Sequence, residues 1–217
     1  MKRTVLILRI IMPIVAITCL VLFPPWDAIR VWIAPLPDSV QEQVDDAVDH
    51  GLDGIILYVD QPGRAPAWYS AGWKNKVTDV PADPNALFKI ASISKLYIAA
   101  AAAKLINSQR LSLDDTLADH LPALVGRIEN AERITLRMLL RHRSGIPDFV
   151  DQPGFDWFIP HTNIEKTLEL VLDKPAEFSP DSRYSYSNTN YLLIGRILDK
   201  VLGYSHQEYI ESEILAP

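Results

Sequence analysis

The stretch Phe88-Lys89-Ile90-Ala91-Ser92-Ile93-Ser94-Lys95 runs directly into an apolar segment, residues 96–106, which includes five consecutive alanines. A segment that is apolar on every side predicts a helix in the middle of a domain. Ser92 and Lys95 lie three residues apart at its start. At this spacing both residues share one helical face, and the lysine amine lies one turn from the serine hydroxyl.

The Ser92–Lys95 pair has the residue types of a nucleophile and its base. A helix N-terminus favours negative charge developing on the serine oxygen, and a desolvated lysine loses its proton more readily. Serine beside a base is the arrangement that forms covalent acyl-enzymes. The alternative is a capping serine beside a surface lysine. We favour the first interpretation, because a lysine in the first turn of an apolar helix has no easy route to water.

A second candidate element is Tyr186-Ser187-Asn188, which precedes an apolar helix predicted over 188–202 and closed by Gly203. A tyrosine near a lysine can exist as phenolate and pass a proton to a leaving group. An asparagine side chain can hold a substrate amide through one donor and one acceptor. The alternative is that Tyr186 belongs to the core and Asn188 caps the helix.

Four segments, in this order, resemble the serine β-lactamase-related family. They are 88–95 (FKIASISK), 111–115 (LSLDD), 139–147 (LLRHRSGIP) and 184–191 (YSYSNTNY). Ser-x-x-Lys is a signature of serine β-lactamases and penicillin-binding proteins. The family contains class C β-lactamases, D-alanyl-D-alanine carboxypeptidases, D-amino peptidases and related esterases. The resemblance covers residues 53–217 and implies an α+β fold, with an antiparallel sheet flanked by helices and a helical subdomain bearing Tyr-x-Asn.

The resemblance also implies roles for individual residues. Ser92 is the expected nucleophile, with its backbone N–H as one oxyanion donor. Lys95 is its expected activating partner, Tyr186 the second base and proton shuttle, and Asn188 the contact to the substrate's amide. His142 and Ser144 lie in a stretch that we interpret as structural support beside the site. No cofactor is implied.

The remaining pattern predicts one hairpin and several short helices. Strands are expected over 55–59 and 67–73, joined by the turn 61–64, after a helix that Asp38-Ser39 caps and Gly51 ends. A hairpin needs further strands, because two alone are marginally stable. The other helices are expected over 114–120, 135–142 and 163–172, and after a capping box formed by Ser205 and Glu208.

Composition excludes several classes of protein. The 217 residues are 48% hydrophobic and 22% charged, with a net charge of −6 and a pI near 5.3. This apolar content excludes a disordered chain, and the acidic balance argues against a nucleic-acid partner. The single cysteine excludes an internal disulfide framework, and the five scattered histidines lack metal-ligand spacing, so no metal is expected.

The N-terminal segment predicts export. Lys2 and Arg3 precede a largely apolar run over 5–23, and Pro24-Pro25 follow it. The run lies between a signal peptide and a membrane span in length, and we prefer an uncleaved anchor because no clear cleavage site follows. We therefore expect an anchor or signal peptide at 1–25, a linker and juxtamembrane helix at 26–52, and an extracytoplasmic hydrolase domain at 53–217.

One family motif is missing. A Lys or His followed two residues later by glycine is expected on a strand after Tyr-x-Asn, but Gly195 and Gly203 lack this context. We therefore expect a fragment, inactive or weakly active by itself. The predicted function is an acyl-enzyme serine hydrolase acting on amide, peptide or ester substrates, whose choice among β-lactam, D-Ala peptide and ester is not readable. The alternative is a non-catalytic cell-wall or partner-binding module derived from the same fold.

Overall fold

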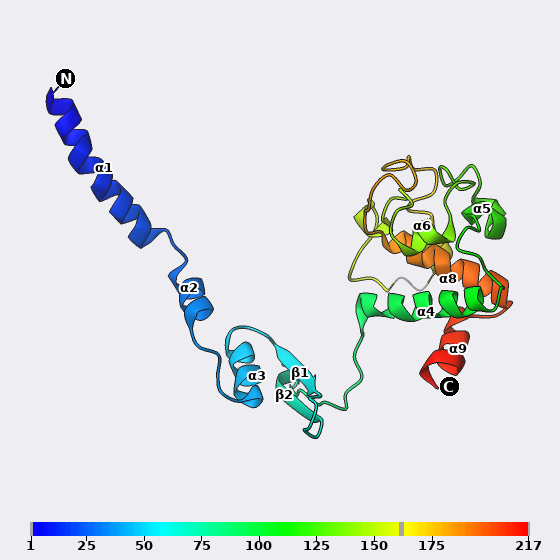
Figure 1. Cartoon of the computed structure of the whole chain (residues 1–217), viewed down its shortest axis with the longest axis horizontal. Helices are drawn as coiled ribbons and strands as arrows, with labels where there is room; N and C mark the ends of the chain where they lie inside the picture. The colour runs from blue at the N-terminus through cyan, green and yellow to red at the C-terminus, as the bar shows by residue number, and fades with distance from the viewer. Residues whose placement is uncertain (1, 161–162, 217) are drawn as a thin grey trace. The chain divides into compact units, whose positions relative to one another are not determined.

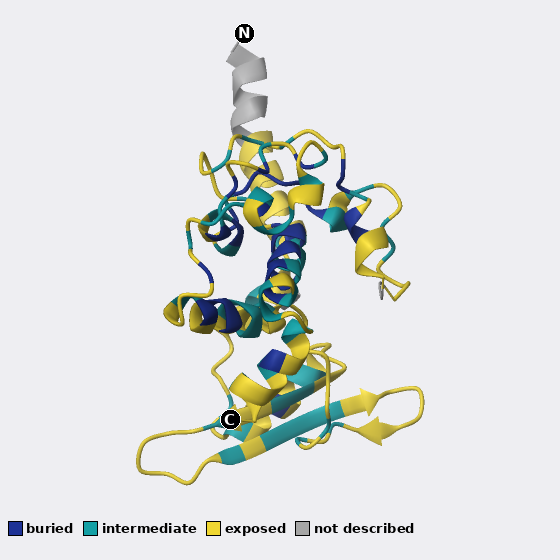
Figure 2. Cartoon of the chain, turned by 90° about the vertical axis from the view of Figure 1, so that its right-hand side faces the viewer, coloured by how far each residue is buried: buried dark blue, intermediate teal, exposed yellow. Residues whose placement is uncertain are grey.

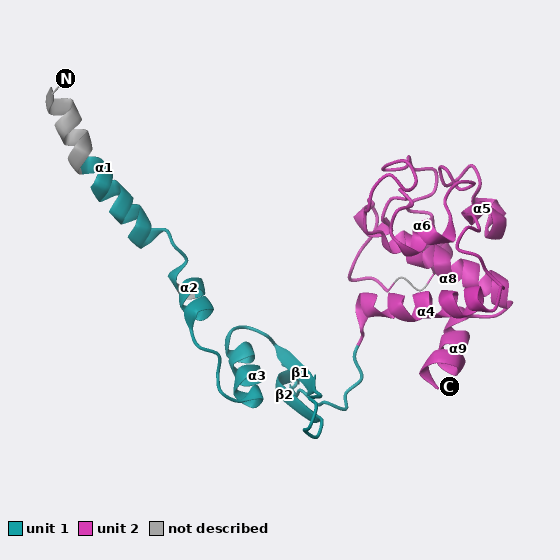
Figure 3. Cartoon of the chain, in the orientation of Figure 1, with its two compact units in different colours: residues 1–88 teal, residues 89–217 magenta. Residues whose placement is uncertain are grey.

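The computed structural model describes residues 2–160 and 163–216, with the side chains of 2–10 and 27 left aside. The chain divides into two compact units, 1–88 and 89–217 (Figure 3). This division falls inside the predicted 53–217 domain, whose limits stay a prediction. The outermost positions of the predicted segments, Met1 and Pro217, lie outside the described residues.

The elements of the first unit are helices followed by short strands (Figure 1). Their bounds are α1 Lys2–Leu22, α2 Trp26–Ile33, α3 Val40–Asp49, β1 Gly54–Val59, β2 Ala67–Asn75 and β3 Val80–Pro81. Among the described residues, no helix has the length and apolar composition that crossing a membrane requires.

The sheet of the first unit is antiparallel, in the order β1-β2-β3. β1 pairs with β2 from Gly54 opposite Gly72 to Val59 opposite Ala67, which confirms the predicted hairpin. Gly72 has φ +72°, and a Cβ there would lie 2.4 Å from the Asp53 carbonyl oxygen, so this pairing requires a glycine. α3 adjoins the hairpin, with Gln41 Nε2 donating to the Ser70 carbonyl at 3.1 Å.

The second unit consists of helices joined by turns and loops. Its elements are the 3₁₀ helix η1 Ala91–Ile93, α4 Ser94–Asn107, α5 Leu117–His120, the 3₁₀ helix η2 Pro122–Leu124, α6 Leu136–Leu140, the 3₁₀ helix η3 Phe149–Asp151, α7 Ile164–Leu168, α8 Asn188–Leu202, α9 His206–Ile210 and the π-helix η4 Glu211–Leu215.

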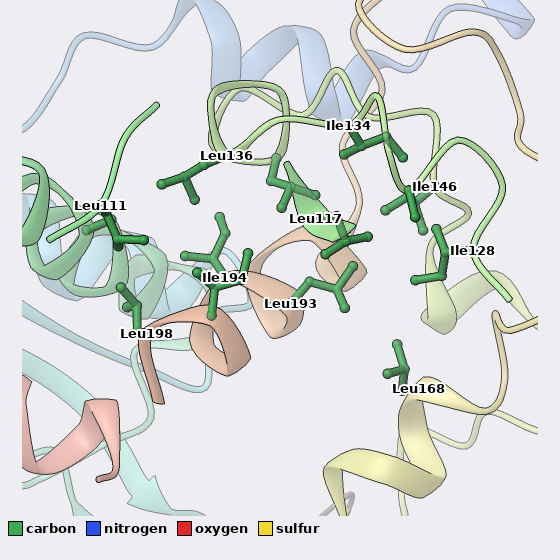
Figure 4. Packing of buried hydrophobic residues seen from close by; sticks show 14 of the residues in the cluster. Leu111, Leu117, Ile128, Ile134, Leu136, Ile146, Leu168, Leu193, Ile194 and Leu198 are labelled. Atoms are coloured by element: carbon green, nitrogen blue, oxygen red, sulfur yellow. The ribbon is translucent and has the colours of Figure 1, made fainter. Parts of the chain in front are cut away.

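The core of the second unit surrounds α8. Leu193 and Ile194 on this helix are fully buried, and Leu117, Leu136 and Ile134 from the preceding segments pack in the same cluster (Figure 4). In Figure 2 the buried residues concentrate on α8 and its neighbours. Since α8 begins with Asn188, this packing fixes the end of the helix on which the Tyr-x-Asn element lies.

Helix α4 buries one face within its own unit, through Ala101, Ala102 and Leu105. The helices α8 and α9 of the same unit contact it. Its burial on every side stays a prediction. The helix also begins at Ser94, so Ser92 lies in the preceding 3₁₀ turn.

Three short helices begin later or end earlier in the structure than predicted. The helix expected over 114–120 begins only at Leu117, since Thr116 has extended backbone and forms a capping box with Asp119. The helix expected over 135–142 ends at Leu140, before His142 adopts φ +53°. Ser205 does cap α9, but its hydroxyl accepts from the Gln207 N–H, so the predicted box with Glu208 is not formed.

The helix predicted over 163–172 is the third. The structure gives α7 only Ile164–Leu168, with Asn163 as the N-cap that accepts from the Lys166 N–H. Beyond it the chain continues in turns, and Asp173 adopts φ +60°. The apolar spacing in this stretch is satisfied by turns that still bury Val171.

Candidate active site

The first two candidate residues come from the η1–α4 junction. Ser92 lies in η1 and Lys95 in the first turn of α4, so the three-residue spacing places them together as predicted. Lys95 Nζ donates to Ser92 Oγ at 3.2 Å. Ala91, immediately before the serine, adopts φ +46°, a conformation that L-residues with side chains rarely take.

The other two candidates come from the start of α8. Tyr186 Oη lies 2.8 Å from Ser92 Oγ, and Asn188 Oδ1 accepts a hydrogen bond from Lys95 Nζ at 2.8 Å. The Lys95 ammonium also lies 5.1 Å from the centroid of the Tyr186 ring. The structure therefore brings together all four residues that the sequence singled out, from segments more than 90 positions apart.

A buried loop, residues 142–148, packs against the Tyr-x-Asn element. The His142 ring stacks on Tyr186 with centroids 4.4 Å apart, and its Nδ1 accepts from the Ser187 N–H at 3.2 Å. Ser144 Oγ donates to Asn190 Oδ1 at 2.6 Å. These contacts place His142 and Ser144 beneath the site, as the structural interpretation of this stretch predicted.

Asp148 is the residue that the sequence reasoning missed. Its side chain is buried, and its Oδ2 accepts from Asn188 Nδ2 at 2.8 Å. The only signal was its position, directly after the Ile146-Pro147 that ends the family-like stretch. A lone aspartate in a loop carries no local pattern that links it to an asparagine 40 residues later.

The electrostatics of the site act mainly on Tyr186 and His142. Burial raises the pKa of the Tyr186 phenol, but the Lys95 ammonium and the Ser92 hydroxyl more than offset this, so the pKa falls below 10.0. Burial lowers the pKa of His142 below 6.5, and the Lys95 charge adds to the effect. The site therefore makes the Tyr186 phenol easier to ionise and the His142 imidazole harder to protonate than in water.

A cavity of about 260 Å³ adjoins two of the four residues. Lys95 and Asn188 border it, with apolar walls from Ile98, Phe149 and Tyr191. A serine in hydrogen-bond contact with a lysine and a tyrosine, near a partly apolar cavity, has the parts needed for acyl transfer.

The comparisons with known proteins agree with this geometry. Protein flp of Staphylococcus aureus is 28% identical over 189 residues, covering 84% of this chain and 38% of its own. Penicillin-binding protein 4* of Bacillus subtilis is 27% identical over 176 residues, covering 77% and 37%. The chain thus spans less than half the length of these curated relatives.

A solved structure of a related enzyme is also similar to this chain. The D-amino acid amidase of Ochrobactrum anthropi SV3, in complex with L-phenylalanine, superposes with a TM-score of 0.72 at 29% identity, covering 82% of this chain and 48% of the amidase. The sequence profile described as Beta-lactamase matches residues 39–217. The predicted β-lactamase/transpeptidase-like fold is therefore confirmed, and this chain belongs to the beta-lactamase family.

Proposed function

We propose that this chain carries the nucleophile, bases and amide contact of a serine hydrolase that works through an acyl-enzyme on amide, peptide or ester substrates. The observation that carries the proposal is the position of Ser92 Oγ, 2.8 Å from Tyr186 Oη and 3.2 Å from Lys95 Nζ. The amidase with a similar fold supports amides as the substrate class. An extracytoplasmic location remains a prediction from the charges and apolar run of the N-terminal segment.

In the proposed reaction, Ser92 Oγ bonds to the substrate carbonyl carbon while its proton passes to Tyr186, whose phenolate is favoured by Lys95. The carbonyl π pair moves to oxygen and returns as the bond to the leaving nitrogen or oxygen breaks. That leaving group takes the proton from Tyr186. Water then attacks the carbonyl carbon of the acyl-enzyme, and Tyr186 accepts the proton of the water. Tyr186 returns that proton to Ser92 Oγ as the carboxylic acid departs.

The amide of Asn188 has two uses in this scheme. Its oxygen holds Lys95 at 2.8 Å, which keeps the ammonium beside both Ser92 and Tyr186. Its nitrogen carries two hydrogens, of which one goes to Asp148. The second is suited to donate to a carbonyl oxygen of the substrate.

The test is covalent labelling of the full-length protein. Incubation with an activated ester or a β-lactam should add the acyl mass to one peptide containing Ser92, measured by intact mass spectrometry and proteolytic mapping. Ser92→Ala should abolish the added mass. Ser182→Ala, at an exposed serine of the same unit, is the matched control and should retain it.

A different outcome would contradict the proposal. If the wild type gains no mass from any acyl donor, yet binds a D-Ala-D-Ala peptide as tightly as Ser92→Ala does, the non-catalytic binding module is the better description.

A further inference from the structure

Asp148 is a buried carboxylate that takes no part in the proton transfers proposed above. Its side chain belongs to a residue only 5% exposed, and it touches two groups. Oδ2 accepts from Asn188 Nδ2 at 2.8 Å, while Oδ1 accepts from the Val150 N–H at 3.4 Å as the N-cap of η3. Burying a carboxylate is costly unless its hydrogen bonds are made, and these two contacts satisfy one acceptor position on each oxygen.

The contact with Asn188 has a directional consequence. An ionised carboxylate only accepts hydrogen bonds, and an ammonium only donates them. Asn188 stands between Asp148 on one side and Lys95 on the other, with 2.8 Å to each. Only one orientation of the amide satisfies both neighbours, with the NH₂ toward Asp148 and the oxygen toward Lys95. Rotating the amide by half a turn would break both hydrogen bonds. It would place the NH₂ against the Lys95 ammonium and the amide oxygen against the Asp148 carboxylate.

We propose that Asp148 is a positioning residue that locks the amide of Asn188 in this orientation and thereby holds the Lys95 ammonium against Ser92. Its effect on catalysis rests on the proposed function, whereas the orientation of Asn188 does not. Through this lock, a loop residue distant from Ser92 in sequence sets the direction of a lysine that contacts the nucleophile. Positioning groups of this kind matter because small misplacements of a catalytic group reduce rates strongly.

The competing explanation is that Asp148 merely caps η3. The two roles separate by side-chain length, because Ser, Asp and Asn all serve well as N-caps. Asp148→Ser keeps a hydroxyl next to the Val150 N–H but is too short to reach Asn188. Asp148→Asn keeps only one of the two acceptor oxygens. When that oxygen caps the Val150 N–H, the new NH₂ faces Asn188 and favours its reversed orientation.

The first experiment measures the acylation rate constant of the full-length protein with an activated ester. Asp148→Ser should slow acylation about 10- to 100-fold and Asp148→Asn by a smaller factor. Asp151→Ser, at the exposed end of η3, is the matched control and should acylate at the wild-type rate. If Asp148→Ser also acylates at the wild-type rate, Asp148 is only a cap and the proposal is wrong.

The same variants give a second kinetic readout that a cap would not move. The Asp148 carboxylate raises the pKa of Tyr186, so both Asp148 variants should shift the acidic limb of the acylation profile to lower pH. An unchanged limb in both variants would show that the carboxylate does not act on the catalytic groups.

The second experiment requires no activity, so it separates failure of this inference from failure of the proposed function. Asn188→Asp places two carboxylates face to face and should lower the melting temperature. Adding Asp148→Asn exchanges the two groups, restores one donor and one acceptor between them, and should regain most of the loss. Strictly additive losses in the double variant would overturn the inference even if Ser92 is acylated. Recovery would support it even if Ser92 is not.

Discussion

The two units of this chain differ in how they hold their side chains. The helical unit, 89–217, has a contiguous core in which Leu193 and Ile194 are fully buried. In the described part of the first unit, Val44 is the one buried apolar residue, and Leu57 in its hairpin is 37% exposed. All the atoms of the candidate site that contact one another belong to the helical unit.

This difference shows where the precision of the site comes from. Hydrogen bonds near 2.8 Å among Ser92, Tyr186, Lys95 and Asn188 require backbones that do not shift. The close-packed core around α8 supplies that rigidity, since packed interiors transmit strain and deform little. The described part of the hairpin unit has few buried side chains of its own.

Core truncation should give the largest contrast between the units. Leu193→Ala removes a fully buried side chain and should lower the free energy of unfolding by about 2–5 kcal/mol, because it leaves a cavity. Leu57→Ala, in the hairpin, should cost less than about 1 kcal/mol. Urea denaturation followed by circular dichroism measures both. Equal losses would contradict the comparison, since they would mean that the hairpin is packed as tightly as the helical unit.

A glycine pair should give the next largest contrast. Gly63 and Gly145 both have φ +81°, but a Cβ on Gly63 meets nothing within 4 Å, whereas one on Gly145 lies 2.1 Å from the Phe178 carbonyl oxygen. Gly63→Ala should therefore cost about 1 kcal/mol, from backbone strain alone. Gly145→Ala should cost about 2–4 kcal/mol, because the loop beneath the site must also move. Thermal melting of the two variants tests this, and similar losses would show that the loop yields easily.

The smallest expected effect is a dependence of stability on pH. The pKa of His142 is lowered in the folded protein, mainly by burial, so the unfolded chain binds its proton more tightly. Stability from this group is complete above 6.5, the ordinary value, and declines as the pH falls below it toward the folded-state pKa. His142→Asn keeps a side-chain acceptor near the Ser187 N–H and tolerates φ +53°.

The measurement is the melting temperature of wild type and His142→Asn between about pH 7.5 and 4.5, a range that spans the ordinary histidine pKa. The difference between the two proteins should shrink at the acid end, because only the wild type loses stability through this imidazole. A constant difference would show that His142 does not titrate in this way.

Much of the fold could be predicted because the signals are local. The helix over 188–202 was predicted with the bounds that the structure shows, since its apolar spacing continues until Gly203 adopts φ +82°. The hairpin followed from two short apolar runs around a Gln-Pro-Gly turn. The four site residues could be named because two motifs, Ser-x-x-Lys and Tyr-x-Asn, lie within four segments that in this order resemble one family.

The rest depended on contacts that the sequence does not display. Asp148 was missed because its partner lies 40 residues away, and nothing next to it in the sequence indicates Asn188. The short helices were overextended because caps such as Thr116 are decided by backbone geometry as well as residue type.

The buried contacts beneath the site have a consequence for recombination. Ser187 with His142, Asn190 with Ser144, and Asn188 with Asp148 all join the same two segments, 142–148 and 187–190. A chimera whose junction lies between these segments inherits the loop from one parent and the helix start from the other. Every such junction therefore takes the two members of each of the three pairs from different parents. The two segments must therefore be exchanged as one unit when this protein is shuffled with a relative.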